Sequence, residues 1–189
     1  MPRLFTGLEI PDDVANTLSL LRGGLVGARW ISPENYHITL RFMGDIDDDI
    51  ASDIFYALQN TGRAPFAVTI EGLDVFGGDK PRALVARVEP TPQLMELQAE
   101  QERLMRRMGL QPETRKFTPH VTLARLRDTS AFNVANYLGL SSHLPPMRFI
   151  TDEFVVFSSR ASVGGGPYIV EAAYPLMHRQ DLSLARQSA

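Results

Sequence analysis

The chain carries one four-residue phrase twice, as His37-Ile38-Thr39-Leu40 and as His120-Val121-Thr122-Leu123. Both copies alternate polar and apolar residues, which is the pattern of a half-buried strand, and on a strand the residues i and i+2 share a face. The His and the Thr of each phrase are therefore predicted to point one way, and the two apolar residues into a core. We expect the two strands to pair across a pseudo-two-fold axis and to bring both His–Thr pairs into one groove.

Elements of the same kind follow one another in the same order around each phrase. We expect strands over residues 4–10, 36–43 and 66–76 in the first half, over 83–88, 120–126 and 147–158 in the second, and a final strand over about 168–175. We expect helices from 12 or 13 to 21 or 25, from about 47 to 58, from 92 to 108 and from 131 to 138. Thr91-Pro92 resembles an N-cap followed by a proline in the first helical position, and Gly109 a C-cap glycine.

The alternation within these strands favours antiparallel sheets over a buried parallel sheet. We predict an α+β fold with two pseudo-symmetric lobes, each a mainly antiparallel sheet with helices on the outside, and an active groove between the lobes. No Pro/Gly/Ser-rich linker separates the repeats, which span about 3–77 and 82–158. We therefore expect residues 1–189 to form a single domain with a shared core, and the polar tail after Leu176 to fray.

Composition narrows the class of protein. The chain has 189 residues, of which 44% are hydrophobic and 22% charged, so a folded globular protein is expected. No apolar run approaches the length of a membrane span, and the N-terminus lacks the apolar stretch of a signal peptide. Because cysteine is absent, disulfide frameworks and thiolate metal sites are excluded. We expect a cytoplasmic monomer without membrane contact.

The net charge of −3 bears on possible nucleic-acid partners. Proteins that coat long nucleic acids are usually basic, because most of their affinity comes from phosphate contacts. We therefore expect no coating of long nucleic acid, and any such partner to be held by a short stretch or an end.

The paired phrases supply the groups for chemistry at a phosphodiester. Imidazole can act as base or acid near neutral pH, so two histidines can take a proton from water and give one to a leaving oxygen. Threonine hydroxyls can donate hydrogen bonds to the oxygens of a phosphoryl group as charge moves onto them. His37, His120, Thr39 and Thr122 are thus predicted to catalyse in-line attack without a metal ion.

Two other interpretations of these residues are weaker. A lone histidine on a strand is usually structural and threonine is a good strand former, but two copies at equivalent positions are not expected by chance. Catalytic zinc usually takes three protein ligands, and the nearby run Asp45 to Asp49 has the form of a charged helix start without metal-ligand spacing. His143 and His178 lack a partner phrase and are interpreted as loop and surface residues.

Through these residues the chain resembles the 2H phosphoesterase superfamily, and within it the RNA 2′,3′-cyclic phosphodiesterases, also called 2′-5′ RNA ligases. The flanking sequences that carry the finer resemblance are Arg3-Leu4-Phe5, residues 30–36 before His37, Leu40-Arg41-Phe42-Met43-Gly44, Phe117-Thr118-Pro119 before His120, and Leu123-Ala124-Arg125. One departure is the strand 83–88, where the family often carries an aromatic residue and this chain has none.

The resemblance assigns roles to individual residues. It implies that His120 is the base that activates water and His37 the acid, and that Thr39 and Thr122 hold the phosphate. Arg125 is similar to a family arginine that helps to hold the phosphate. By strand alternation Arg125 should face away from His120, so this role requires a bulge or a strand end between them. Three aromatic residues could stack on a base, namely Phe5, Phe42 and Tyr168.

The resemblance implies hydrolysis of RNA 2′,3′-cyclic phosphate ends to 2′-phosphates, with possible 2′-5′ ligation. The substrate would be an RNA end or a nucleoside cyclic phosphate, with no metal or nucleotide cofactor. One alternative is a 2H relative that acts on another cyclic phosphodiester. Another is a non-catalytic module that binds RNA ends, although binding alone would not require two complete His–Thr pairs.

Overall fold

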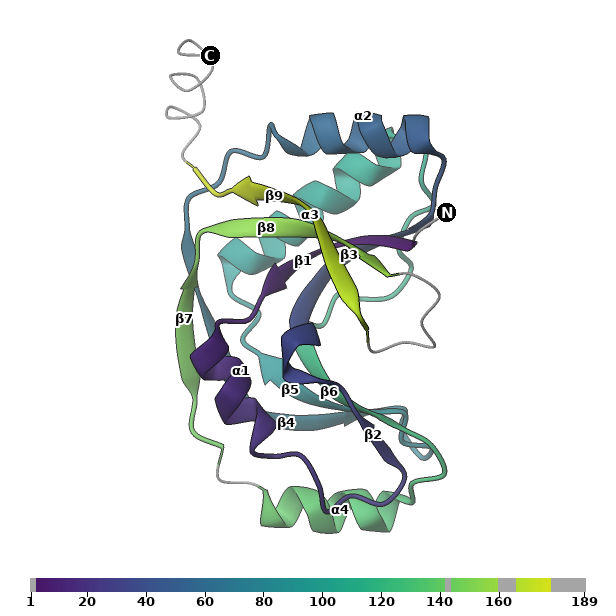
Figure 1. Ribbon diagram of the computed structural model, residues 1–189, viewed down its shortest axis with the longest axis vertical. Helices are drawn as coiled ribbons and strands as arrows, with labels where there is room; N and C mark the ends of the chain where they lie inside the picture. The colour runs from purple at the N-terminus through teal and green to yellow at the C-terminus, as the bar shows by residue number, and fades with distance from the viewer. Residues whose placement is uncertain (1–2, 142–143, 160–165, 178–189) are drawn as a thin grey trace.

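The structure is a computed structural model that describes residues 3–141, 144–159 and 166–177 (Figure 1). The strands are β1 Arg3–Glu9, β2 Ala28–Trp30, β3 His37–Asp45, β4 Phe66–Phe76, β5 Ala83–Val88, β6 His120–Leu126, β7 Met147–Thr151, β8 Glu153–Ser159 and β9 Tyr168–Pro175. The helices are α1 Asp12–Ser19, α2 Asp48–Leu58, α3 Pro92–Arg107 and α4 Ala131–Leu140, with a 3-10 turn over Pro33–Asn35. The expectations for His143, His178 and the tail from residue 178 lie outside the described residues.

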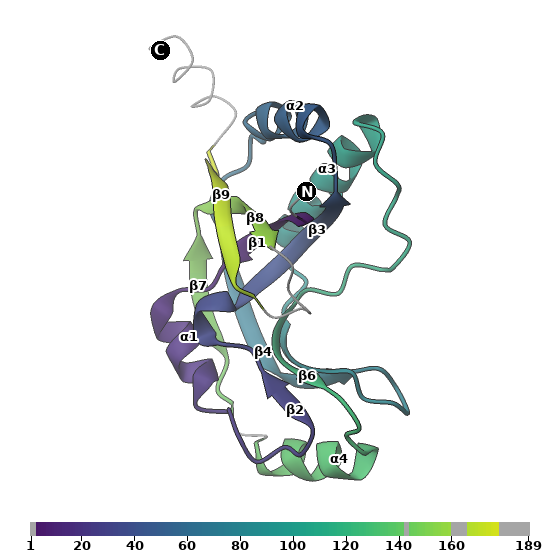
Figure 2. The ribbon, with the colours of Figure 1, turned by 45° about the vertical axis from the view of Figure 1, so that its right-hand side comes forward.

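The strands form a curved sheet in the order β7-β4-β5-β6-β3-β1-β8-β9, with β2 paired to β6. Every strand pair within the described residues is antiparallel. We call β3, β1, β8 and β9 lobe 1, and β6, β5, β4 and β7 lobe 2; they meet where β3 pairs with β6 (Figure 2). The predicted α+β fold with two mainly antiparallel lobes is thereby confirmed.

The two lobes exchange their last strands. β4 ends the first half of the sequence but pairs with β5 of the second half, whereas β8 comes late in the chain and pairs with β1. This exchange explains one wrong prediction, that residues 147–158 form a single strand. The chain leaves lobe 2 after β7, which pairs with β4, and enters lobe 1 as β8, so the strand is broken at Asp152.

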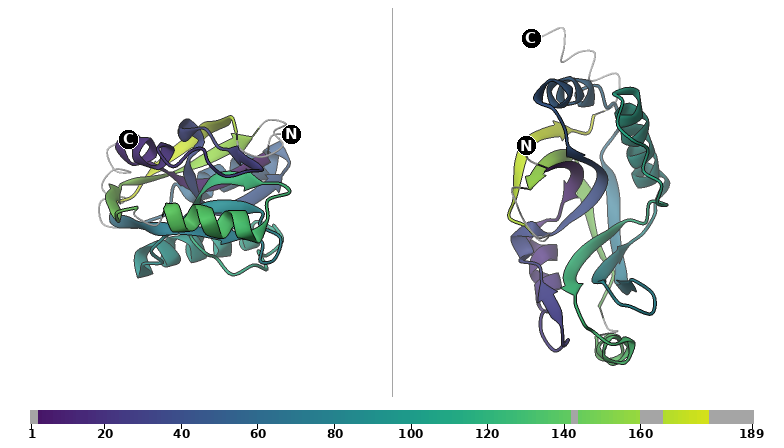
Figure 3. Two further views of the ribbon diagram at one scale, coloured as in Figure 1. Left: turned by 90° about the horizontal axis from the view of Figure 1, so that it is seen from below. Right: turned by 90° about the vertical axis from the view of Figure 1, so that its right-hand side faces the viewer.

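The helices lie outside the sheet, with α2 and α3 together at one end of the elongated molecule and α4 at the other (Figure 3). The cap signals of α3 were correct: Thr91 accepts a hydrogen bond from the Leu94 amide at 3.4 Å, and the helix ends just before Met108 and Gly109. Its buried face includes Leu94, Leu97 and Gln101. α1 ends at Ser19, two residues before the earlier of the two expected ends.

The apolar positions of the duplicated phrase form part of the core where the lobes meet. Ile38 and Val121 are fully buried, and so is Leu123, while Leu40 is nearly so. No helix within the described ranges is long and apolar enough to cross a membrane.

Candidate active site

The strands that carry the two phrases meet at their apolar residues. Ile38 of β3 lies directly opposite Val121 of β6 in an antiparallel pair. Continuing this register places His37 across from Thr122, and Thr39 across from His120. Directly opposite Cα atoms in such pairs are about 5 Å apart, so four polar side chains from distant parts of the sequence converge on one face.

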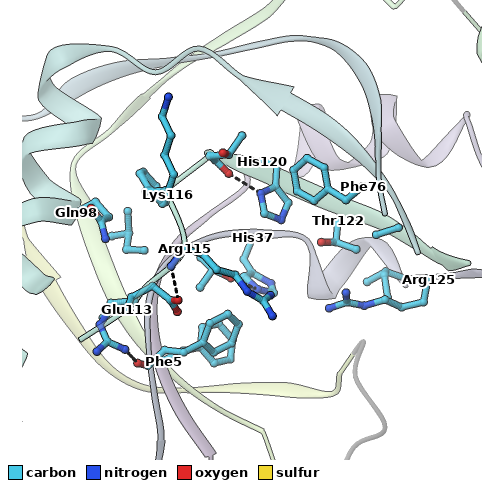
Figure 4. A pocket seen from close by; sticks show the side chains of 18 of the residues that line it. Phe5, His37, Phe76, Gln98, Glu113, Arg115, Lys116, His120, Thr122 and Arg125 are labelled. Atoms are coloured by element: carbon cyan, nitrogen blue, oxygen red, sulfur yellow. Dashed lines mark hydrogen bonds between the residues drawn. The ribbon is translucent and has the colours of Figure 1, made fainter. Parts of the chain in front are cut away.

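This face opens into a cavity of about 720 Å³ (Figure 4). All five residues predicted from the sequence line it: His37, Thr39, His120, Thr122 and Arg125. Figure 4 shows Arg125 and Phe76 at one end of the cavity and Gln98 and Glu113 at the other, with the histidines between them. A cavity of this size is in the range of sites for small organic ligands.

A bulge turns Arg125 into the cavity. In β6, Ala124 lies opposite Leu84 but Thr122 lies opposite Val85, so Leu123 is an extra residue without a partner on β5. The extra residue shifts the alternation by one position, and Arg125 therefore lines the same cavity as Thr122. The bulge that the role of Arg125 requires is thus present.

The same bulge occurs at the equivalent position of lobe 1. Arg41 lies opposite Thr6 and Thr39 opposite Gly7, so Leu40 is the extra residue in β3. As a result the exposed Phe42 lines the cavity, as Arg125 does in lobe 2, whereas Arg41, which also borders the cavity, has its side chain buried.

Both histidine rings are oriented by a backbone carbonyl two residues earlier. The Nδ1 of His37 lies 2.8 Å from the Asn35 carbonyl, and the Nδ1 of His120 lies 2.7 Å from the Thr118 carbonyl. Because a carbonyl can only accept, Nδ1 must donate and carry the proton, which leaves Nε2 as the basic atom of the neutral ring. The Nε2 of His37 is 3.1 Å from the Thr39 hydroxyl. Each histidine is held in the tautomer that proton transfer at Nε2 requires.

Burial lowers the pKa of both histidines. It takes the pKa of His37 to about 4, helped by the positive charges of His120 and Arg125 and opposed by the hydrogen bond to Asn35. Burial and Arg125 also lower the pKa of His120, against the hydrogen bond to Thr118. Aromatic rings bury His37 more deeply than His120. The ring centroids of Phe5 and Tyr168 each lie 4.9 Å from that of His37, whereas His120 contacts the ring of Phe76 at 4.7 Å.

The polar network of Arg41 was not foreseen from the sequence. Its buried guanidinium is paired with Glu102 of α3 and also donates to the carbonyls of Phe42 and Gln111. Glu102 accepts a further hydrogen bond from the Glu113 amide at 3.2 Å. The segment between α3 and β6, which supplies Glu113 and the cavity residues Arg115 and Lys116, is therefore tied to β3 and α3. Regular alternation after Thr39 would place the Arg41 side chain on the groove face, and the bulge at Leu40 leaves it buried instead.

Two His–Thr pairs that face one cavity across a pseudo-two-fold axis define the 2H class of phosphoesterases. The family model described as LigT-like phosphoesterase matches the chain twice, over residues 8–86 and 85–168. The chain therefore belongs to the LigT-like phosphoesterase family, in which the two matches correspond to the two repeats.

Curated relatives carry the name RNA 2′,3′-cyclic phosphodiesterase. One from Thermotoga maritima is 30% identical over 178 residues, which are 89% of this chain and 92% of the relative. Another from Aeropyrum pernix is 36% identical over 104 residues, or 54% of this chain, and the match spans 59% of that relative's length.

Solved structures share the fold. Escherichia coli LigT complexed with 3′-AMP superposes with a TM-score of 0.74 at 21% identity, covering 93% of this chain and 99% of LigT. A crystal structure described as a phosphoesterase gives a TM-score of 0.75 at 20% identity, covering 94% of this chain and 99% of that protein. At these identities the likeness establishes the arrangement of the elements.

Proposed function

We propose that this chain hydrolyses the 2′,3′-cyclic phosphate ends of RNA to 2′-phosphates. The observation that carries the proposal is the pairing of Ile38 with Val121, because it brings two His–Thr pairs to one cavity. The name of the Thermotoga maritima relative, which matches nearly the whole chain, supports the same reaction. Both repeats contribute residues to the cavity, which supports the proposal that the chain acts as one domain.

In this reaction the neutral Nε2 of one histidine takes a proton from water, and the water oxygen attacks phosphorus. The bond from phosphorus to the ribose 3′ oxygen breaks, and the protonated second histidine gives its proton to that oxygen. The hydroxyls of Thr39 and Thr122 donate to the two non-bridging oxygens, and Arg125 supplies a positive charge beside them. The phosphate remains on the 2′ oxygen.

The two histidines differ in a way that bears on their roles. The pKa of His37 is lowered to about 4, so this ring is the one that starts neutral and acts as the base. Burial lowers the pKa of His120 as well, so in this order His120 starts protonated only at acidic pH, where it acts as the acid. This order is opposite to the one that the family resemblance implies, and the drier aromatic surroundings of His37 are its physical cause.

The reaction needs no metal ion in this proposal. Within the described part of the chain, no group of three or more histidine or carboxylate side chains could hold one. Transesterification would follow the same path with an RNA 5′-hydroxyl in place of water, which would form a 2′-5′ bond. The substrate class among cyclic phosphodiesters depends on the cavity walls.

The test is incubation with nucleoside 2′,3′-cyclic phosphates and with a short RNA that bears a cyclic end, in excess EDTA. Chromatography that separates 2′- from 3′-phosphates should find the 2′ product at an unchanged rate. His37→Ala and His120→Ala should each lower kcat by about 10²- to 10⁴-fold. Tyr56→Ala, at an exposed site on α2 outside the cavity, is the matched control. Loss of activity on chelation with rescue by zinc or manganese would contradict the proposal, as would a 3′-phosphate product.

A further inference from the structure

The two lobes differ in how far their outer strands extend. In lobe 1, β9 pairs with the whole of β8, and its first residue, Tyr168, lies opposite the last residue of β8. In lobe 2, β7 pairs only with residues Phe66 to Ile70 of β4. The end of β4 at Phe76, which contacts His120, therefore has no outer strand among the described residues. Of the described outer strands, one thus reaches the histidine of lobe 1 and none reaches that of lobe 2.

The first residue of β9 places an aromatic ring on His37. The ring of Tyr168 meets the imidazole edge-on, at an interplanar angle of 81°, and it meets the ring of Phe5 in the same way, at 86°. Its centroid lies 4.9 Å from that of His37 and 5.3 Å from that of Phe5. How well this ring excludes water from His37 therefore depends on what holds the start of β9.

The side chain of Asn35 holds the start of β9 through two contacts. Its Oδ1 accepts a hydrogen bond from the backbone amide of Tyr168 at 3.0 Å. Gly166 passes directly over the same carboxamide, since a Cβ at Gly166 would lie 2.3 Å from Oδ1. The φ of Gly166 is +91°, so both its conformation and its close approach favour glycine.

Asn35 is itself fixed by its backbone. It ends the 3-10 turn Pro33–Asn35, and its amide donates to the Ser32 carbonyl at 2.9 Å. Its own carbonyl accepts from Nδ1 of His37. Thr118 has the same backbone role for His120 in lobe 2, but its side chain makes no hydrogen bond within the described part of the chain. Only the lobe 1 residue therefore connects its histidine to an outer strand.

We propose that Asn35 is a positioning residue for His37: its side chain holds the start of β9 so that the ring of Tyr168 shields the imidazole from water. The proposal deepens the proposed function and rests on it for the role of His37 in proton transfer. All the contacts that support it lie within the chain, so it can be tested without a substrate. Asn35 thus orients the histidine with its backbone and keeps it dry with its side chain.

The electrostatics of His37 indicate what loss of the shield would do. Burial is the largest cause that lowers the pKa of His37 to about 4, and the charges of His120 and Arg125 lower it further. The other titratable or charged groups across the sheet or around the cavity are Glu9 of β1, the phenol of Tyr168, Arg41, Glu113, Arg115 and Lys116. Because loss of the shield admits water and leaves these charges in place, it should raise the pKa of His37 towards 6.5.

The experiment follows the ring protons of both histidines by NMR during a pH titration of the full chain without substrate. Asn35→Ala removes the acceptor for the Tyr168 amide but keeps the backbone carbonyl that orients His37, whereas Tyr168→Ala removes the ring itself. Each should raise the midpoint of His37 by about one pH unit or more and change that of His120 by less. Thr118→Ala, the matched control from lobe 2, should leave the midpoint of His37 unchanged.

Two further variants test whether Asn35 acts through Tyr168. In the double variant Asn35→Ala/Tyr168→Ala the midpoint of His37 should be no higher than in Tyr168→Ala alone, because both changes remove the same shield. Gly166→Ala, whose Cβ collides with the Asn35 carboxamide, should raise the midpoint as Asn35→Ala does. The pH profile of kcat/KM on a nucleoside 2′,3′-cyclic phosphate should show one midpoint displaced by the same amount.

The NMR midpoints decide the proposal separately from activity. An unchanged His37 midpoint in Asn35→Ala would overturn it, and so would an unchanged midpoint in Gly166→Ala if the first variant failed to fold. A rise in Asn35→Ala without one in Tyr168→Ala, or rises that add in the double variant, would also overturn it, since Asn35 would then act without the ring. If the midpoints move as expected in a protein that turns over no cyclic phosphodiester, Asn35 holds the shield as proposed and the proposed function is contradicted.

Discussion

The unequal burial of the two histidines makes a specific prediction about pH. The profile of kcat/KM reports the pKa values of the free enzyme. We expect a bell-shaped profile. Activity should rise with a midpoint near pH 4, where His37 loses its proton, and it should fall again with a midpoint below pH 6.5, where His120 loses its proton. The maximum should therefore be acidic, and the two midpoints belong to the coupled pair.

The size of the effect follows from the shift at His37. A fall of its pKa from 6.5 to about 4 corresponds to about 3 kcal/mol against charging the ring in the folded protein. At pH 6.5, roughly 0.3% of the His37 rings should be protonated, where an exposed histidine would be half protonated. The unfolded chain takes up this proton near pH 6.5, and the folded protein only near pH 4. The free energy of unfolding therefore has its full value above about pH 6.5 and falls as the pH drops from there towards 4.

The assay uses a substrate with sulfur in place of the 3′ leaving oxygen, which needs little protonation. On this substrate the His120→Ala variant should recover activity. Its pH profile should keep the midpoint near pH 4 and should no longer fall at higher pH. His37→Ala should not recover. NMR of the ring protons of His37 should give the same midpoint in the free protein. A midpoint near 6.5, or recovery of His37→Ala in place of His120→Ala, would refute the assignment of His37 as the base.

Four further substitutions test the phosphate-binding threonines, the charge of Arg125 and the buried ion pair of Arg41. Thr39→Val and Thr122→Val should each lower kcat by about 10²-fold or more in single-turnover assays while circular dichroism stays unchanged, because each removes a donor to the phosphoryl oxygens. Arg125→Gln should weaken substrate binding and raise the pKa of both site histidines, as NMR titration can follow, and unshifted midpoints would exclude its charge as a cause. Glu102→Gln should lower the free energy of unfolding by about 3 kcal/mol in urea titrations, because the buried Arg41 loses its carboxylate; a loss below about 1 kcal/mol would contradict this.

Several elements could be predicted because their signals are local. The bounds of α3 follow from Thr91-Pro92 and Gly109, and β5 and β6 were predicted to the residue. β2 and the 3-10 turn were missed, because three residues carry no periodicity to detect. The break at Asp152 could not be read from the sequence, since it arises from pairing with two different partner strands.

The repeated phrase by itself determined that two strands would present a histidine and a threonine each, since alternation with period two is a property of a few adjacent residues. It also determined the chemistry that these groups can perform. Only the tertiary structure decided that Ile38 meets Val121, that bulges at Leu40 and Leu123 turn Arg41 inward and Arg125 into the cavity, and that Phe76 stands beside Ala83. Register and bulges depend on how many residues the partner strand places opposite, and that partner lies far away in the sequence.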